Sequence, residues 1–305
     1  MTLNDLCEQN NIVDIDSYLR YRKSKPSYIY HYTSTQGFLN IFEHANIRLT
    51  NCNCLNDKKE FVYLIELISN YDFKNYVFKN VIKEIGQTMG EKRNYYIKGN
   101  EDSQSPKYYI LSCSLEDDLL PMWIYYSKNG GYYGYSLKFR TDRLIKNLSK
   151  TNNGKLLYGT VIYNKERQIR IIKQIVESVF KGYGISGEDI LNKNYSEADY
   201  IQASLEVIEA LSYIRIFFKD TNFRNELEYR FAILNSSDAD NFSIDDKGFI
   251  RNFIEKSICD PFPISGITMS PSMEFLNNFI SIQNYMKSRN MRPIIIKKSK
   301  LNMRF

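Results

Sequence analysis

The sequence predicts an α+β fold: a split, mixed β-sheet whose strands are separated by helical insertions. Segments rich in aromatic or alternating residues, typical of strands, recur from residue 27 to residue 297. Segments with apolar residues at helical spacing interrupt them, most extensively over residues 164–218. A further strand-like segment, 226–234, follows that helical stretch and carries charged residues. Strands interrupted in this way indicate a mixed α+β arrangement.

Length and composition fit an ordinary globular protein. The chain has 305 residues, 43% of them apolar, which is enough for a hydrophobic core. No internal repeat is visible. We therefore expect a single domain over residues 1–305, with helical insertions at about 57–90 and 164–218.

Charge and cysteine content narrow the functional classes. The net charge of +6 arises from 41 basic and 35 acidic residues without any run of like charge, so nucleic acid is allowed but not required as a partner. The amino terminus carries no basic or apolar segment and no apolar run approaches the length of a membrane span, which favours a cytoplasmic protein without a membrane partner. Five irregularly spaced cysteines suit reduced thiols.

The first third of the chain alternates between strands and helices. An aromatic strand is followed by Thr33, Ser34 and Thr35, each able to cap a helix that carries Phe38 and Phe42 on one face. The expected elements are, in order, a helical lead-in over 1–26, a strand over 27–33, the capped helix, a strand over 47–49, a polar turn over 52–57 and two helices.

A polar stretch, 90–107, carries Gly, Ser, Asn and Pro and is expected to be a mobile loop. The elements expected after it are a strand over 108–115, a short helix over 121–126, a tight turn over 129–131 with a strand over 132–139, a strand over 156–163, helices over 164–218, strands over 226–234 and 249–258, a helix from residue 270 and a last strand over 292–297.

The segment 226–234 is the most informative part of the sequence. Side chains alternate along a strand, so Glu226, Glu228 and Arg230 are expected on one face, and Leu227, Tyr229 and Phe231 on the other. Two neighbouring carboxylates repel, so one favours its protonated form while Arg230 holds the other ionised. This pattern predicts a core face and a functional face. The alternative is an exposed edge strand with solvated charges.

Other motifs carry little chemistry. The glycine-rich segment 129–134 is followed by a strand and by no Lys-Ser or Lys-Thr pair, so it is neither a P-loop nor a dinucleotide fingerprint. His44 with Cys52 and Cys54 lacks a fourth zinc ligand, and two histidines in all exclude a histidine-rich metal site. We expect no metal. No nucleophile accompanies His31.

Four short motifs together carry a family resemblance. The chain contains His31-Tyr32-Thr33, then Asn56-Asp57 with Glu60, then Met122-Trp123 with Tyr126, and finally Lys219 with Glu226-x-Glu228-x-Arg230. This series resembles a large uncharacterised bacterial family with H-Y-T, M-W-x-x-Y and E-x-E-x-R motifs. Phe223 stands where that family usually has Trp, a change that affects packing more than chemistry.

The order His, Tyr, Glu is similar to that of ADP-ribosyltransferases of the H-Y-E type, which have a split mixed sheet. The resemblance implies that His31 binds a ribose hydroxyl of NAD, that Tyr126 or Tyr125 stacks on the nicotinamide, and that Glu228 binds the nicotinamide-ribose 2′-hydroxyl. Glu226 would position the acceptor. The implied catalytic set is Glu228, Glu226, His31 and Tyr126, and the implied NAD-binding set is His31, Tyr32, Thr33, Arg48, Trp123, Tyr125, Tyr126, Lys219 and Arg230.

The residue chemistry agrees with this. Loss of nicotinamide leaves positive charge on the ribose, which a nearby carboxylate stabilises while an aromatic face holds the leaving group. Arginine and lysine suit the two phosphates of NAD. Each residue also has a plain alternative: His31 as a hydrogen-bonded core histidine, and Trp123, Tyr125 and Tyr126 as packing residues.

We therefore expect an NAD-dependent ADP-ribosyltransferase of bacterial toxin or phage-defence type. NAD is its substrate, and a cytoplasmic protein or nucleic acid is its acceptor. A neutralising antitoxin or a regulatory protein is a further expected partner. The alternatives are an NAD glycohydrolase, an inactive sensor domain that binds a nucleotide or partner, and a nucleic-acid-binding module, which the lack of a basic cluster disfavours.

The enzyme hypothesis makes two spatial predictions. His31, Tyr126 and Glu228 should converge on one cleft although they are far apart in the sequence. The 90–107 loop and the 164–218 insertion should flank that cleft and shape the acceptor site, because loops on a rigid scaffold usually carry specificity.

Overall fold

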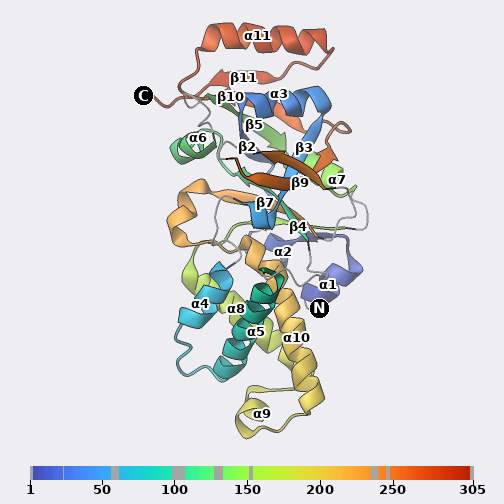
Figure 1. Ribbon diagram of the computed structural model, residues 1–305, viewed down its shortest axis with the longest axis vertical. Helices are drawn as coiled ribbons and strands as arrows, with labels where there is room; N and C mark the ends of the chain where they lie inside the picture. Colours follow the sequence, from blue (N-terminus) through green and yellow to red (C-terminus); the bar gives the residue numbers. More distant parts are fainter. Residues whose placement is uncertain are drawn as a thin grey trace.

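A computed structural model describes residues 3–22, 24–55, 62–97, 107–126, 133–150, 154–234, 240–244 and 248–302, with the backbone alone over residues 92–97. Within these ranges the chain has a mixed α+β fold, with one large mixed sheet and helices on both of its faces (Figure 1). This confirms the coarser part of the prediction, a mixed α+β class with a mixed sheet.

The described strands form one eleven-stranded sheet. The main path runs in the order β1-β6-β7-β4-β2-β5-β10-β11, and β3, β9 and β8 branch from β4. Among the described strands, β1–β6 and β10–β11 are parallel pairs and the others are antiparallel. The bounds are β1 Ile12–Asp14, β2 Tyr28–Ser34, β3 Asn46–Asn51, β4 Tyr108–Ser114, β5 Gly134–Arg140, β6 Lys155–Thr160, β7 Glu228–Leu234, β8 Asn241–Ile244, β9 Ile250–Ser257, β10 Ile264–Met269 and β11 Ile295–Lys298.

The sheet forks along one edge of β4. At one end of β4, Ser114 pairs with Tyr30 of β2, and at the other end Ile110 pairs with Thr50 of β3. Strand β3 then continues to β9 and β8. Ser112 lies between the two pairings, so its backbone faces the fork on this edge. The opposite edge of β4 pairs with β7 over the whole length of both strands.

Helices α4, α5, α8, α9 and α10 lie in the part of the molecule farthest from α11 (Figure 1). Helices α4 and α5 pack together, and α10 contacts both α5 and α8. Their bounds are α4 Tyr63–Asn70, α5 Lys79–Ile97, α8 Lys165–Gly182, α9 Gly187–Asn192 and α10 Glu197–Ile214. These helices occupy the two regions in which the sequence predicted helical insertions. Together with Ile110, Leu157 and Ala232 of the sheet, they enclose the larger hydrophobic core.

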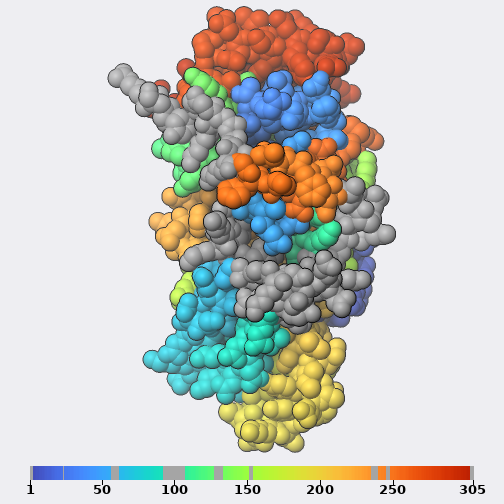
Figure 2. All heavy atoms as spheres, in the orientation of Figure 1, coloured from blue at the N-terminus to red at the C-terminus, as the bar shows by residue number. Residues whose placement is uncertain are grey.

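Helices α3 (Thr35–His44), α7 (Thr141–Leu148) and α11 (Phe275–Ser288) enclose a second core with the opposite sheet face. Figure 2 shows α3 and the β8–β9 strands on the surface between α11 and the helical half. The remaining elements are short: α1 Leu3–Gln9, α2 Ile15–Tyr18, α6 Leu120–Tyr126, and the 3-10 helices η1 Cys52–Cys54, η2 Arg215–Phe217 and η3 Thr221–Glu226. None of the described helices is long and apolar enough to span a membrane.

Strand β7 is central, so the edge-strand alternative is wrong. It lies between β6 and β4, and all seven of its residues are buried. Tyr229, Phe231 and Ile233 belong to the α3–α7–α11 core, whereas Ala232 and Leu234 belong to the other core. The alternation predicted for Tyr229 and Phe231 is therefore confirmed, but both faces of this strand are covered.

Several element predictions need correction. Helix α5 continues to Ile97, so residues 90–97 are helical instead of part of a loop, and residues 98–106 lie outside the described ranges. Helix α11 begins at Phe275, after Glu274 caps it through the backbone N–H groups of Leu276 and Asn277. Strands β1, β8 and β10 and helix α7 were not predicted, because short segments give weak periodicity.

Candidate functional site

Two carboxylates share one ammonium group at the start of β7. Lys219 Nζ lies 2.6 Å from Glu226 Oε2 and 3.3 Å from Glu228 Oε2. All three side chains are almost completely buried. Charges this deep require partners, since an unpaired buried ion costs several kcal/mol, on the order of the whole stability of a domain.

Arg230 completes this group, which we call the ionic cluster (Lys219, Glu226, Glu228 and Arg230). Its Nε and Nη2 donate to the two carboxylate oxygens of Glu228, at 2.7 and 2.8 Å, and its Nη1 donates to the carbonyl of Ile216 at 2.6 Å. This two-pronged geometry fixes the carboxylate plane. Two cations balance two carboxylates, so the cluster carries no net charge when all four groups are ionised.

The backbone conformation around Leu227 differs from the regular strand that the sequence predicted. Glu226 ends η3 instead of lying in the strand, and Leu227 adopts a left-handed conformation with φ of 46°. Leu227 is 39% exposed, so the expectation that it faces the core is wrong. The turn at Leu227 brings Glu226 and Glu228 to the same ammonium group.

Burial and charge compete in setting the protonation of the cluster. Burial raises the pKa of Glu228, the positive charge of Lys219 opposes this shift, and Glu226 reinforces it. Burial alone would lower the pKa of Lys219, but Glu228 and Glu226 outweigh it and raise that pKa, which keeps the ammonium protonated. The repulsion expected between the two glutamates is therefore present and is offset by the shared cation.

Aromatic and hydroxyl groups surround the cluster. Burial raises the pKa of the Tyr126 phenol, and the nearby charges of Glu228 and Glu226 add to the shift. The Tyr163 hydroxyl accepts a hydrogen bond from the backbone N–H of Glu228 at 3.1 Å. Ser114 Oγ donates to the carbonyl of Glu226 at 2.8 Å, and the Ser112 side chain hydrogen-bonds Glu228. Tyr126 is thus close enough to both glutamates to feel their charge.

His31 does not join this cluster. Tyr30 pairs with Ser114, which pairs with Glu228, so these three side chains share one face of the sheet. His31, one residue further along β2, therefore projects from the opposite face, where its ring meets the Phe139 ring edge-on at 6.4 Å. The prediction that His31, Tyr126 and Glu228 converge on one cleft is wrong for His31, because the strand register separates it from the other two.

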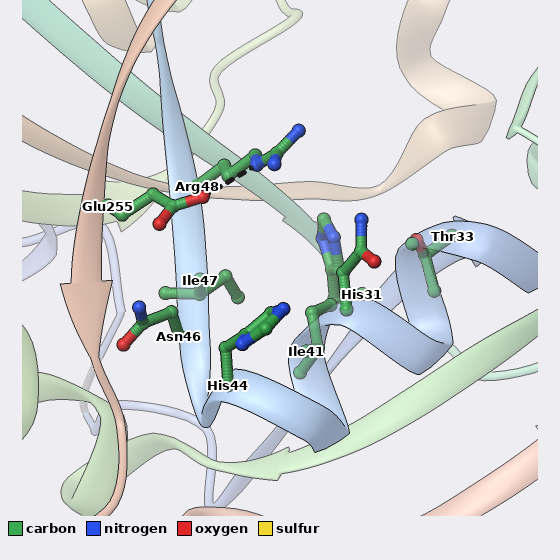
Figure 3. A pocket seen from close by; sticks show the side chains of 10 residues that line it. His31, Thr33, Ile41, His44, Asn46, Ile47, Arg48 and Glu255 are labelled. Atoms are coloured by element: carbon green, nitrogen blue, oxygen red, sulfur yellow. Dashed lines mark hydrogen bonds and ion pairs between the residues drawn. The ribbon is translucent and has the colours of Figure 1, made fainter. Parts of the chain in front are cut away.

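His31 instead lines a second site with two other predicted residues. A cavity of about 120 Å³ lies among β2, α3 and β3, and its walls include His31, Thr33, Arg48 and Glu255 (Figure 3). Arg48 Nε donates to Glu255 Oε1 at 2.9 Å, and its guanidinium lies 4.3 Å above the ring of Phe253. We call this cavity the His31 pocket.

The protonation of His31 follows from its partner. His31 Nδ1 lies 3.2 Å from the carbonyl oxygen of Ser112, which only accepts, so Nδ1 carries the proton. Burial lowers the pKa of the ring, against a smaller opposite effect of this hydrogen bond. The imidazole is then neutral near pH 7, and Nε2 is a hydrogen-bond acceptor. This form suits contact with a hydroxyl group.

Two predicted NAD-binding residues, Trp123 and Tyr32, belong to a small apolar cluster against which Tyr126 packs. Trp123 is completely buried, packs edge-on against Tyr32 at 4.8 Å and donates from Nε1 to Asp118 at 2.8 Å. The Tyr32 hydroxyl donates a hydrogen bond to the carbonyl of Glu116 and accepts one from the backbone N–H of Leu119. Tyr125 is 52% exposed on α6. Trp123 and Tyr32 are therefore packing residues in this conformation.

A family model matches the middle of the chain. Residues 122–231 match a family described as a protein of unknown function, DUF2971. This span begins at Met122 in α6 and ends at Phe231 in β7, so it contains Tyr126 and the whole ionic cluster but not His31. The match agrees with the predicted resemblance to an uncharacterised family. No curated protein and no solved structure matches the chain.

Sequence reasoning missed Ser112, Ser114 and Tyr163. The alternating polar positions of the 108–115 strand were a signal for the two serines, because polar side chains in a buried strand need partners. Among the described residues no group of three or more His, Cys, Asp and Glu side chains could hold a metal ion. The motif residues Asn56, Asp57 and Glu60 lie outside the described ranges.

Proposed function

We propose that this chain cleaves the bond between nicotinamide and ribose in NAD and transfers the ADP-ribose to a macromolecule, with Glu228 as the catalytic carboxylate. The observation that carries the proposal is the ionic cluster, in which Lys219 and Arg230 hold two buried carboxylates beside Tyr126. Functional sites are where buried, mutually perturbed ionisable groups concentrate.

The chemistry that this cluster supports is stabilisation of a developing cation. As nicotinamide leaves, positive charge grows on the ribose, and a carboxylate in a water-poor site stabilises that charge strongly. Arg230 fixes the orientation of Glu228 through both oxygens. Tyr126 offers an aromatic face for the leaving nicotinamide. Glu226, held more closely by Lys219, is the group assigned to positioning the acceptor.

Substrate access requires a local opening. Glu228 is only 3% exposed, so a ribose hydroxyl reaches it only if a neighbouring group moves. The 3.3 Å contact of Glu228 with Lys219 is longer than either of its hydrogen bonds with Arg230, and Lys219 keeps its 2.6 Å partner Glu226 when that contact is lost. Arg230 meanwhile continues to hold the carboxylate in place.

The His31 pocket supports a binding role close to this cluster. His31 contacts the Ser112 carbonyl, and Glu228 contacts the Ser112 side chain, so one residue of β4 links the two sites. The strands of His31 and Glu228 flank β4. Neutral His31 and cationic Arg48 provide an acceptor for a ribose hydroxyl and a partner for a phosphate. An NAD molecule in the His31 pocket would meet both His31 and Arg48.

Incubation with NAD labelled in its adenylate half tests the proposal. We expect label on a macromolecule when cell extract is present, and none with Glu228→Gln. Glu188→Gln, an equally conservative change at an exposed position of α9, is the matched control and should behave as wild type. Free labelled ADP-ribose without macromolecular label would indicate a glycohydrolase. Intact NAD in every reaction would contradict the proposed activity.

A second candidate function is a sensor that binds a nucleotide without turnover. Two observations favour it: both cations of the cluster already engage Glu228, and His31 projects from the other sheet face. Equilibrium dialysis with NAD separates the candidates. A sensor binds NAD and leaves it intact, and the Arg48→Gln variant of a sensor no longer binds NAD.

A further inference from the structure

A groove on the far side of the sheet from the His31 pocket is lined by three arginines together with apolar and uncharged polar residues. It lies between the end of α2 and one face of α8 and has a volume of about 440 Å³. Arg20 follows α2, while Arg167 and Arg170 lie one turn apart on α8, and all three line the groove. We call it the arginine groove.

The positive charges of the three arginines are not neutralised by carboxylates in the lining of the groove. No carboxylate is among the described residues that line it. Arg167 is held by stacking, with its guanidinium carbon 4.5 Å from the centre of the Tyr21 ring, a contact that leaves its positive charge in place. Its Nε is buried and has no hydrogen-bond acceptor among the described atoms. Buried donors without acceptors are rare and costly, which indicates a site prepared for an anion.

We propose that the arginine groove binds a nucleoside diphosphate. Guanidinium groups bind phosphate through paired hydrogen bonds, and three of them on adjacent walls suit two linked phosphates better than one. The volume falls within the usual range for small-ligand sites, about 300–1,000 Å³. Tyr18, Leu19, Ile171 and Ile175 form the apolar part of the lining, which suits a base and ribose.

The arginine groove is connected to the ionic cluster through Gln168, but it is a separate site. Gln168, next to Arg167, donates from Nε2 to the carbonyls of Ile162 and Lys219 at 2.6 and 3.0 Å. Lys219 is the residue whose ammonium joins the two glutamates. The groove is nonetheless lined by neither glutamate, so the proposal does not depend on NAD cleavage.

Isothermal titration of the full chain with ADP, and separately with inorganic pyrophosphate, tests the proposal. We expect both probes to bind, with ADP affinity at least about tenfold weaker for Arg170→Gln and for Arg167→Gln, because each loses a charge-assisted contact. Arg170→Lys keeps the positive charge but cannot make paired hydrogen bonds to a phosphate. It should therefore bind ADP more tightly than Arg170→Gln and more weakly than wild type. Arg289→Gln, the same charge change at an exposed position near Glu43, is the matched control and should bind as wild type.

Four outcomes would overturn the proposal. Wild type could fail to bind either probe, or both α8 variants could bind ADP as wild type does. ADP affinity could instead be lost on Arg48→Gln and kept in Arg170→Gln, which would place ADP in the His31 pocket. Finally, a single-stranded oligonucleotide could depend on these arginines while ADP does not bind, which would assign the groove to nucleic acid. Thermal melting of each variant confirms folding, and Arg170 is exposed, so its variants are expected to fold.

Discussion

Arg230 and Glu228 face each other along one side of β7, two residues apart, and are joined by two hydrogen bonds of 2.7 and 2.8 Å. Arg230 is 1% exposed and Glu228 3% exposed, in a strand with neighbours on both sides. A bidentate pair in this position fixes the carboxylate plane and supplies the positive charge that burial requires.

Removal of Arg230 should strongly destabilise the fold. In Arg230→Gln the carboxylate of Glu228 loses both guanidinium hydrogen bonds and keeps the longer 3.3 Å contact with Lys219 and the Ser112 hydrogen bond, so a buried charge loses its main partner. We expect the free energy of unfolding to fall by about 3–5 kcal/mol, measured by urea denaturation. The control is Glu255→Gln, which breaks the exposed pair with Arg48 and should cost less than about 1 kcal/mol. Equal losses for the two variants would show that the cluster does not depend on Arg230.

The two glutamates should differ in activity if the proposed function holds. Glu228→Gln keeps the shape but removes the charge next to the ribose, so nicotinamide release should fall on the order of 100-fold or more while NAD binding survives. Glu226→Gln should spare nicotinamide release and impair transfer to the acceptor. Nicotinamide release and acceptor labelling are measured separately on folded protein. Normal turnover in Glu228→Gln together with loss in Glu226→Gln would reverse the assignment.

The backbone at Leu227 should prefer glycine to alanine. Its φ of 46° lies in the left-handed region, which costs roughly 1–2 kcal/mol for a residue with a Cβ and nothing for glycine. Both substitutions remove the same partly exposed side chain, so the difference between their free energies of unfolding reports the cost of the left-handed backbone conformation. We expect Leu227→Gly to be more stable than Leu227→Ala by about 1 kcal/mol in urea denaturation. Greater stability of the alanine variant would refute the left-handed turn.

Stability should fall in mild acid through His31. Burial lowers the pKa of this ring below its ordinary value of 6.5, so the folded state binds fewer protons than the unfolded state between the two pKa values. Stability is then fully present above about pH 6.5 and is lost as the pH decreases below that value. Melting temperatures at pH 7.5 and pH 5.5 measure the effect.

A glutamine variant isolates the contribution of His31. His31→Gln retains a donor for the Ser112 carbonyl but cannot titrate, so its melting temperature should fall less than that of wild type between the two pH values. The chain has two histidines, and His44 is exposed, so His44→Gln is the matched control and should show the wild-type decrease. An unchanged pH dependence in His31→Gln would contradict the assigned role.

The sequence alone determined the mixed α+β class, most of the elements and three of the four members of the ionic cluster. Alternation placed Tyr229 and Phe231 in a core, and helical spacing located the helices of both insertions. The charges of Glu226, Glu228 and Arg230 marked the site because buried strands rarely contain charge without a reason. These inferences succeed because local periodicity and the cost of burying charge are already present in the residues themselves.

Only the tertiary structure decided which residues meet. The position of β7 between β6 and β4, the left-handed turn at Leu227 and the contact of Lys219 with both glutamates depend on pairings between distant segments. The same holds for His31: moving by one residue along β2 changes the sheet face, so the register with β4 places it in a pocket opposite Glu228. Register is fixed by the packing of the entire sheet, and a local pattern of residues does not encode it.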